Sequence, residues 1–126
     1  MEKRLKQILE HMTTTIEGIV ASAVVLQTDG LALATLTTDT DTDCEAVSAF
    51  VAGLVNSNQK SGELLGTEHG AEDIIAATAQ NFLVIRPIPA QGVFFYVMTE
   101  KNNRLGKTWS TMKKYEKYLI ETLDRR

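Results

Sequence analysis

The stretch that decides the fold runs from Gly18 to Thr35 and reads GIVASAVVLQTDGLALAT. Its two halves are rich in β-branched and other apolar residues, which suit a pleated, half-buried surface. They meet at Asp29-Gly30, a dipeptide that favours the positive backbone dihedral angles of tight hairpin turns. The stretch therefore predicts a β-hairpin with strands over residues 19–27 and 31–36.

A helix is predicted on either side of this hairpin. Residues 2–15 place apolar side chains at helical spacing, and Gly18 can release the chain from this helix into the first strand. The apolar residues are Leu5, Ile8, Leu9, Met12 and Ile16. After a polar loop, Thr42 and Glu45 have the spacing of a capping box, so a second helix should begin near Asp43 and end at Gly62 or Gly66.

The second helix is predicted to have two different faces. Large side chains form a broad arc that can pack on the sheet: Cys44, Val47, Phe50, Val51, Leu54 and Val55. Beside the arc runs a strip of small and polar residues, which we call the helix strip: Ala46, Ala49, Gly53 and Asn56. A glycine inside a helix costs about 1 kcal/mol relative to alanine. Either another helix approaches Gly53 closely, or this glycine relieves crowding against the chain's own sheet.

Three further strands are predicted at residues 72–79, 82–88 and 93–99, and a last helix at 103–123. The connections between these strands are short, which requires antiparallel neighbours, because a parallel crossover needs a dozen or more residues. The element order α-β-β-α-β-β-β-α predicts an α/β protein of the α+β type. Its core is a five-stranded antiparallel sheet with helices on both faces.

The composition indicates a single globular domain over residues 1–126. The chain is 44% hydrophobic and 23% charged, and its formal net charge of −3 provides no general attraction to a phosphate backbone. We therefore expect no nucleic acid among its partners. No stretch approaches the roughly 20 apolar residues of a membrane span, and the N-terminal residues lack the apolar core of a signal peptide. We expect a cytoplasmic protein without direct membrane insertion, and a single cysteine fits a reducing compartment.

Charge is unevenly distributed along the chain. Residues 28–73 hold nine acidic residues against Lys60, whereas residues 101–126 hold eight basic residues against three acidic ones. Either this asymmetry steers a partner, or the basic residues form a solvated helix face that suits the C-terminal helix dipole.

Two fragments imitate ligand sites but lack residues that the geometry requires. Residues 39–43 have the alternating acidic spacing of a calcium loop, but Cys44 replaces the required glycine and Phe50 the bidentate glutamate. Residues 106–108 read GKT, as at the end of a phosphate-binding loop, but Lys101 stands where the first glycine belongs. We expect neither calcium nor nucleotide to bind at these fragments.

No residue pattern predicts catalysis. Cys44 would lie in the first turn of the second helix, where the dipole can lower the pKa of a thiol. It also falls on the apolar arc, which favours a buried structural role. His11 and His69 have no cysteine or acidic residue at metal-ligand spacing. The sequence thus predicts a non-enzymatic protein with no cofactor and no bound metal.

Four segments carry a family resemblance, in their order and their separation along the chain. They are Ile16–Val20 at the start of the first strand, residues 28–34 with the aspartate-glycine turn, the small-residue helix at 46–53, and residues 103–106 at the start of the last helix. Together they resemble the Roadblock or dynein light chain 7 domain family over nearly the whole chain, and in particular its bacterial gliding-motility branch of GTPase regulators. The resemblance implies a Roadblock-like sheet with profilin-like architecture.

The resemblance also implies a homodimer. The second helix would pair with its copy, and the strand after it would join its copy, so that two five-stranded sheets become one. The residues placed to do so are Ala46, Ala49, Gly53 and Asn56 on the helix and Ile74, Ala76 and Thr78 on the strand. Pairing would also remove an exposed sheet edge, which is an aggregation hazard.

The function implied by the resemblance is a non-enzymatic regulator or scaffold of a small Ras-like GTPase. The alternative is a structural adaptor for motor, filament or signalling assemblies without effect on nucleotide state. A small-ligand sensor fits less well, because the sequence shows neither a convergent polar pocket nor a cofactor motif. On charge alone, Lys113, Lys114 and Lys117 are the candidates to meet acidic residues of such a partner.

Overall fold

The helices and strands of the computed structural model, which describes residues 1–126, follow one another in the predicted order. Their bounds are α1 Glu2–Thr15, β1 Ile19–Leu26, β2 Ala32–Thr37, α2 Cys44–Leu65, β3 Ile74–Ala77, β4 Asn81–Ile88, the short 3₁₀ helix η1 Pro89–Gln91, β5 Val93–Glu100 and α3 Leu105–Leu123.

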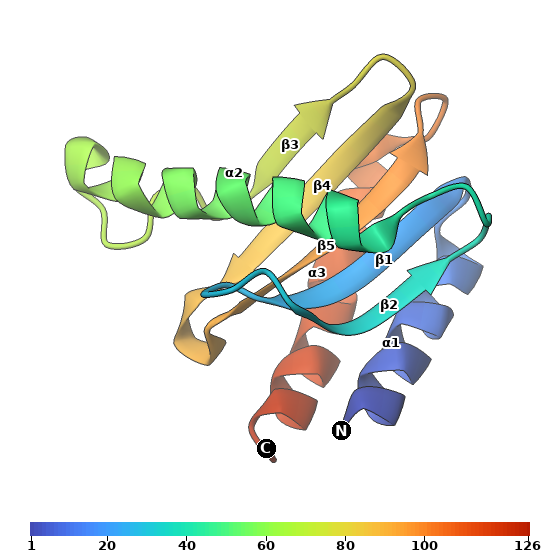
Figure 1. The fold of residues 1–126 in the computed structure, drawn as a ribbon, viewed down its shortest axis with the longest axis horizontal. Helices are drawn as coiled ribbons and strands as arrows, with labels where there is room; N and C mark the ends of the chain where they lie inside the picture. The colour runs from blue at the N-terminus through green and yellow to red at the C-terminus, as the bar shows by residue number, and fades with distance from the viewer.

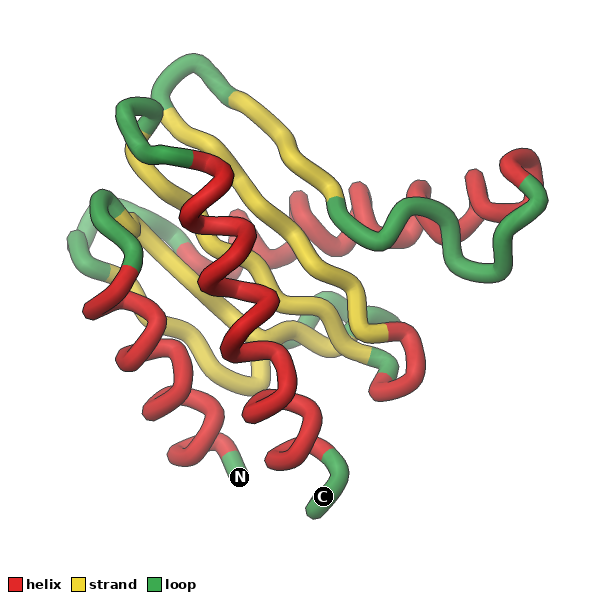
Figure 2. The backbone as a smooth tube through the Cα atoms, turned by 180° about the vertical axis from the view of Figure 1, so that it is seen from behind, coloured by secondary structure: helices red, strands yellow, loops and turns green.

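One antiparallel sheet joins all five strands in the order β2-β1-β5-β4-β3, so that β2 and β3 form its edges. Helices α1 and α3 lie side by side on one face, and α2 crosses the other face (Figure 1). The view from behind shows the same three layers, with α1 and α3 nearest the reader (Figure 2). The α+β fold with helices on both faces of the sheet is therefore confirmed.

The sheet separates two apolar cores. Strand β5, in the middle of the sheet, contributes side chains to both of them. Successive side chains of a strand point to opposite faces, so Phe95 enters the core beneath α1 and α3, while Phe94 and Tyr96 enter the core beneath α2. All three aromatic side chains are fully buried.

The β1–β2 turn differs from a tight two-residue hairpin. Gly30 adopts a φ of 72°, but no residue other than glycine has a positive φ, so Asp29 does not take the conformation that a type I′ turn needs. Instead the turn runs from Leu26 to Leu31. The carbonyl of Leu26 accepts from the amide of Gly30, and the Asp29 carboxylate accepts from the amide of Leu31. The glycine is required as predicted, whereas the aspartate acts through its side chain.

Two element boundaries also differ from the prediction. Asp43, not Thr42, is the N-cap of α2, because its carboxylate accepts from the amides of Glu45 and Ala46. Gly66 ends the helix at a φ of 71°, the later of the two predicted ends. Strand β3 has four residues rather than eight, so Thr78 lies outside it.

Helix α2 extends past the edge of the sheet. Its first half packs on β1 and β2, whereas its C-terminal half projects beyond β3 (Figures 1 and 2). The loop over residues 66–73 folds back along this projecting half. Here Gly62 and Gly70 let two backbones approach, since a Cβ added to Gly70 would lie 2.2 Å from the carbonyl oxygen of Asn58.

Candidate self-association site

The helix strip lies on the outer side of α2. All four of its residues are exposed. A Cβ added to Gly53 would meet no atom within 4 Å, so this glycine does not relieve crowding against the chain's own sheet. The structure therefore excludes crowding as the reason for Gly53, and the close approach of another helix stays a prediction.

Phe50 was predicted on the buried arc, and that prediction is wrong. The side chain is 54% exposed and stands one helical turn from Gly53 and Ala46, beside the helix strip. The remaining apolar residues of the arc are buried or half-buried. The spacing of Phe50 to Ala46 and Gly53, four and three residues, was the signal that could have placed it on this side of the helix.

Two exposed leucines stand at the C-terminal end of α2. Leu64 is 90% exposed, and at about 100° per residue it lies in line with Ala46. Leu65 is exposed as well. Isolated surface leucines need no explanation, and the polar residues Ser57, Lys60 and Ser61 separate Leu64 from the helix strip.

Strand β3 supplies an unpaired sheet edge next to the projecting half of α2. Thr78, in the turn after β3, donates its amide to the carbonyl of Asn81 at 2.9 Å. Because backbone groups alternate in direction along a strand, those of Ala76 and Ile74 also face β4, and those of Ile75 and Ala77 face the open edge. The side chains of Ile74 and Ala76 pack in the core beneath α2.

The three predicted contact lysines lie on the opposite layer, on the outer side of α3. The ammonium groups of Lys113, Lys114 and Lys117 stand 4.4, 6.0 and 5.1 Å from the ring centres of Trp109, Tyr115 and Tyr118, respectively. None of the three lysines has a carboxylate within 4.0 Å, since all the ion pairs of the chain involve either Arg86 or His69. The structure thus exposes the helix strip on the outer side of α2 and the unpaired edge of β3, and leaves the lysines on a separate face without ion pairs.

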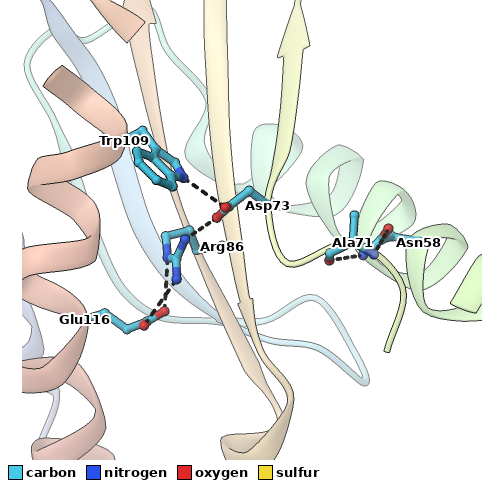
Figure 3. A network of polar contacts seen from close by, with 6 residues as sticks. All are labelled: Asn58, Ala71, Asp73, Arg86, Trp109 and Glu116. Carbon is cyan, nitrogen blue, oxygen red and sulfur yellow. Dashed lines mark hydrogen bonds and ion pairs between the residues drawn. The ribbon is translucent and has the colours of Figure 1, made fainter. Parts of the chain in front are cut away.

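A buried polar cluster between β3, β4 and α3 was not found by sequence reasoning. Arg86 on β4 is only 8% exposed and donates to the carboxylates of Asp73 and Glu116. Trp109 on α3 donates its Nε1–H to the second oxygen of Asp73 at 2.9 Å (Figure 3). Burial alone would lower the pKa of Arg86, but the hydrogen bonds and charges of Glu116 and Asp73 outweigh burial and raise it. An arginine inside an apolar strand was the only signal for this cluster.

Cys44 lies against a second buried hydroxyl cluster beneath α2. Its Sγ is 3.7 Å from the hydroxyl oxygen of Tyr96. Burial raises the pKa of the Cys44 thiol, and the hydrogen bond from Tyr96 offsets this only in part. The thiol therefore has less thiolate character than a free cysteine, which agrees with a structural role.

Two of the three carboxylates in the calcium-like run over residues 39–43, those of Asp39 and Asp43, are used in local hydrogen bonds. Asp39 accepts from the amides of Asp41 and Thr42, and the pKa of Asp39 is lowered, first by its side-chain hydrogen bond with Thr42 and then by these amides. Asp43 caps α2. No group of three or more histidine, cysteine or acidic side chains has an arrangement that could hold a metal ion.

The phosphate-loop-like residues open α3 beside a polar cleft of about 650 Å³. Lys107 and Arg104 line this cleft, but so do the carboxylates of Glu17 and Glu100, which disfavour a phosphate. The hydroxyl of Thr108 is already bound to Asn103.

None of α1, α2 and α3 contains a segment with both the length and the apolar character that crossing a membrane demands.

Known structures share this fold. The MglB protein of Myxococcus xanthus superposes with a TM-score of 0.85 at 15% sequence identity, over 98% of this chain and 97% of that one. The gliding protein MglB of Thermus thermophilus gives 0.85 at 15%, over 99% and 92%. A Roadblock/LC7 domain from Streptomyces avermitilis gives 0.72 at 13%, over 91% and 97%.

Comparison by sequence identifies a family but no individual curated relative. No curated protein matches this chain. The Roadblock/LC7 domain model, by contrast, matches residues 13–95, from the end of α1 to the beginning of β5. Because this match spans well over half of the sequence and the structural likeness extends over all of its elements, the chain belongs to the Roadblock/LC7 domain family.

Proposed function

We propose that this protein is a non-enzymatic, homodimeric regulator or scaffold of a small Ras-like GTPase, working in the cytoplasm. The observation that carries the proposal is the separation of two surfaces on opposite layers. The helix strip and the β3 edge suit a second copy of the chain, and the cationic side of α3 stays free for another partner.

The self-association part of the proposal is supported by the shape of α2. Small side chains at Ala46, Ala49 and Gly53 would let two helices approach closely, with Phe50 covering the flank. In the same assembly the free backbone groups of Ile75 and Ala77 would pair with those of the copy. An isologous contact of this kind closes on itself and leaves no further edge at β3.

The partner class is supported by the family and by charge. The fold is that of MglB, which is called a gliding protein in its Thermus form, and the sequence resembles the gliding-motility branch of GTPase regulators. The unpaired lysines on α3 would meet acidic residues of a GTPase switch region, with their ammonium groups held over aromatic rings. The chain itself supplies no hydrolytic residue to this complex.

The test is binding of a Ras-like GTPase encoded beside this chain in its genome, loaded with a GTP analogue or with GDP. A regulator must distinguish the two states, because only a differential affinity shifts an equilibrium. We expect the two affinities to differ about tenfold, which corresponds to about 1.4 kcal/mol.

Charge variants refine this experiment. Lys113→Glu should weaken binding of the GTPase, whereas Lys3→Glu, which makes the same change of net charge on α1, should not. Binding should also weaken with added salt. Equal affinity for both nucleotide states, with unchanged hydrolysis and exchange rates, would contradict the regulator and favour the adaptor without effect on nucleotide.

A further inference from the structure

The start of the edge strand β3 is held from both layers of the molecule. On one side, Asn58 of α2 forms two hydrogen bonds with the backbone of Ala71, at 2.9 and 3.0 Å. On the other side, Asp73 is bound by Arg86 and by Trp109 of α3. Figure 3 shows the two sets of contacts on either side of the segment that leads into β3.

Asp73 occupies the position directly before β3 and has both of its carboxylate oxygens in use. Oδ1 accepts from the Arg86 guanidinium and Oδ2 from the indole of Trp109. The Arg86 side chain is fixed in turn by two hydrogen bonds to Glu116, at 3.1 and 3.3 Å. Hydrogen bonds between charged groups are about twice as strong as neutral ones, so this cluster fixes the position of Asp73 relative to α3.

Strand β3 needs such a support. It has four residues, pairs only with β4, and has half-buried or exposed side chains throughout. Short edge segments with few buried contacts open at low free energy. A strand that must first be ordered binds its partner more weakly than one already in place.

We propose that Asp73 is a positioning residue that holds β3 ready to pair with a second copy of the chain, and that Trp109 connects this edge to the cationic side of α3. This inference rests on the proposed self-association. Lys113 lies 4.4 Å above the ring of Trp109, and the indole of the same residue contacts Asp73. A partner that moves Lys113 or Trp109 thereby changes the affinity of the chain for its copy, and by linkage self-association changes the affinity for that partner.

The test compares two variants that each remove one carboxylate from Arg86. Asp73→Ala cuts the contact to β3, whereas Glu116→Gln changes the contact on α3 and leaves β3 attached. Dimer dissociation constants come from sedimentation of a dilution series, and the fold of each monomer is checked by circular dichroism at the lowest concentration. We expect Asp73→Ala to weaken the dimer at least tenfold and Glu116→Gln to weaken it less than threefold.

Hydrogen exchange gives a second readout, which a general loss of stability would not produce. In the Asp73→Ala monomer the amides of β3 should exchange faster, while those of β1 and β5 keep their protection. Trp109→Phe removes only the indole donor and should weaken the dimer by a smaller factor, which keeps the test available if Asp73→Ala does not fold.

The outcomes separate this inference from the proposed function. If the Asp73→Ala variant dimerises as tightly as wild-type protein, or if Asp73→Ala and Glu116→Gln weaken the dimer equally, the positioning role alone is overturned. Wild-type protein that stays monomeric at every concentration would overturn both the positioning role and the proposed self-association.

Discussion

The hydroxyl oxygen of Tyr96 lies 3.0 Å from Oγ of Ser48, where α2 crosses the middle of the sheet. Both residues are buried, and the Ser48 hydroxyl depends on Tyr96 for its hydrogen bond, whereas the Tyr96 hydroxyl also contacts Cys44. Burial raises the pKa of Tyr96 above its ordinary value of 10.0, and the pKa of the neighbouring Cys44 above 9.0. Ionisation of the Tyr96 hydroxyl or of the Cys44 thiol therefore weakens the contact between α2 and β5.

This cluster predicts a loss of stability at alkaline pH. In the unfolded chain Cys44 and Tyr96 ionise at lower pH than in the folded chain. For each group, the folded state therefore binds more protons than the unfolded state at any pH between the group's unfolded and folded pKa. The free energy of unfolding should stay level up to about pH 9 and fall as the pH rises further. Tyr96→Phe should cost about 1 kcal/mol at neutral pH, because Ser48 loses its partner, and should make the alkaline fall shallower. Urea denaturation at several pH values measures both effects.

Gly53→Arg should separate the two copies of the chain. The added side chain meets no atom of its own protomer, and arginine is a better helix former than glycine, so the monomer should stay folded and gain up to about 1 kcal/mol. A charged side chain at a helix contact should nevertheless make the protein monomeric in sedimentation. The control is Gly106→Arg in α3, where the site is equally open. If Gly53→Arg remains a dimer of unchanged affinity, the helix strip is not the contact.

Gly70→Ala should be much more damaging than Gly92→Ala. Both glycines have a positive φ, 79° and 67°, so both variants have a similar backbone strain of about 1 kcal/mol. Only at Gly70 does the new methyl group collide with the backbone of α2, at Asn58. We expect Gly70→Ala to lower the free energy of unfolding by about 1–3 kcal/mol more. Equal costs in chemical denaturation would mean that the returning loop moves aside freely.

Thr99→Val should stabilise the protein. The hydroxyl of Thr99 is completely buried in β5 and has no hydrogen-bond partner. Replacing it with a methyl group of similar size removes an unsatisfied polar atom, which costs about 1–3 kcal/mol where it occurs. Thr108→Val is the control, since its buried hydroxyl is bound to Asn103, and this variant should be destabilised. A lower melting temperature for Thr99→Val would contradict the conclusion that the Thr99 hydroxyl has no hydrogen-bond partner.

The sequence predicts those parts of the fold that depend on short-range patterns. Periodicity placed all three helices and five strands, and the helical spacing of Ala46 and Gly53 placed the helix strip on one side of α2. Phe50 was misplaced because an apolar residue at the border of two faces is assigned by its type unless its surroundings are known. The cluster at Arg86 could not be predicted, since its partners Asp73 and Glu116 lie 13 and 30 residues away and only the tertiary fold brings them together.

The chain ends meet on the layer formed by α1 and α3. Met1 and Arg125 line the same surface depression, and both ends emerge side by side in the two ribbon views. In a two-fold assembly built through α2 and β3, whatever is fused to either end would project away from the joined helices. Fluorescent labels or affinity tags at position 1 or 126 are thus expected to leave pairing undisturbed. A circular permutant, with these two ends joined by a short linker and the chain opened at another loop, should keep the fold.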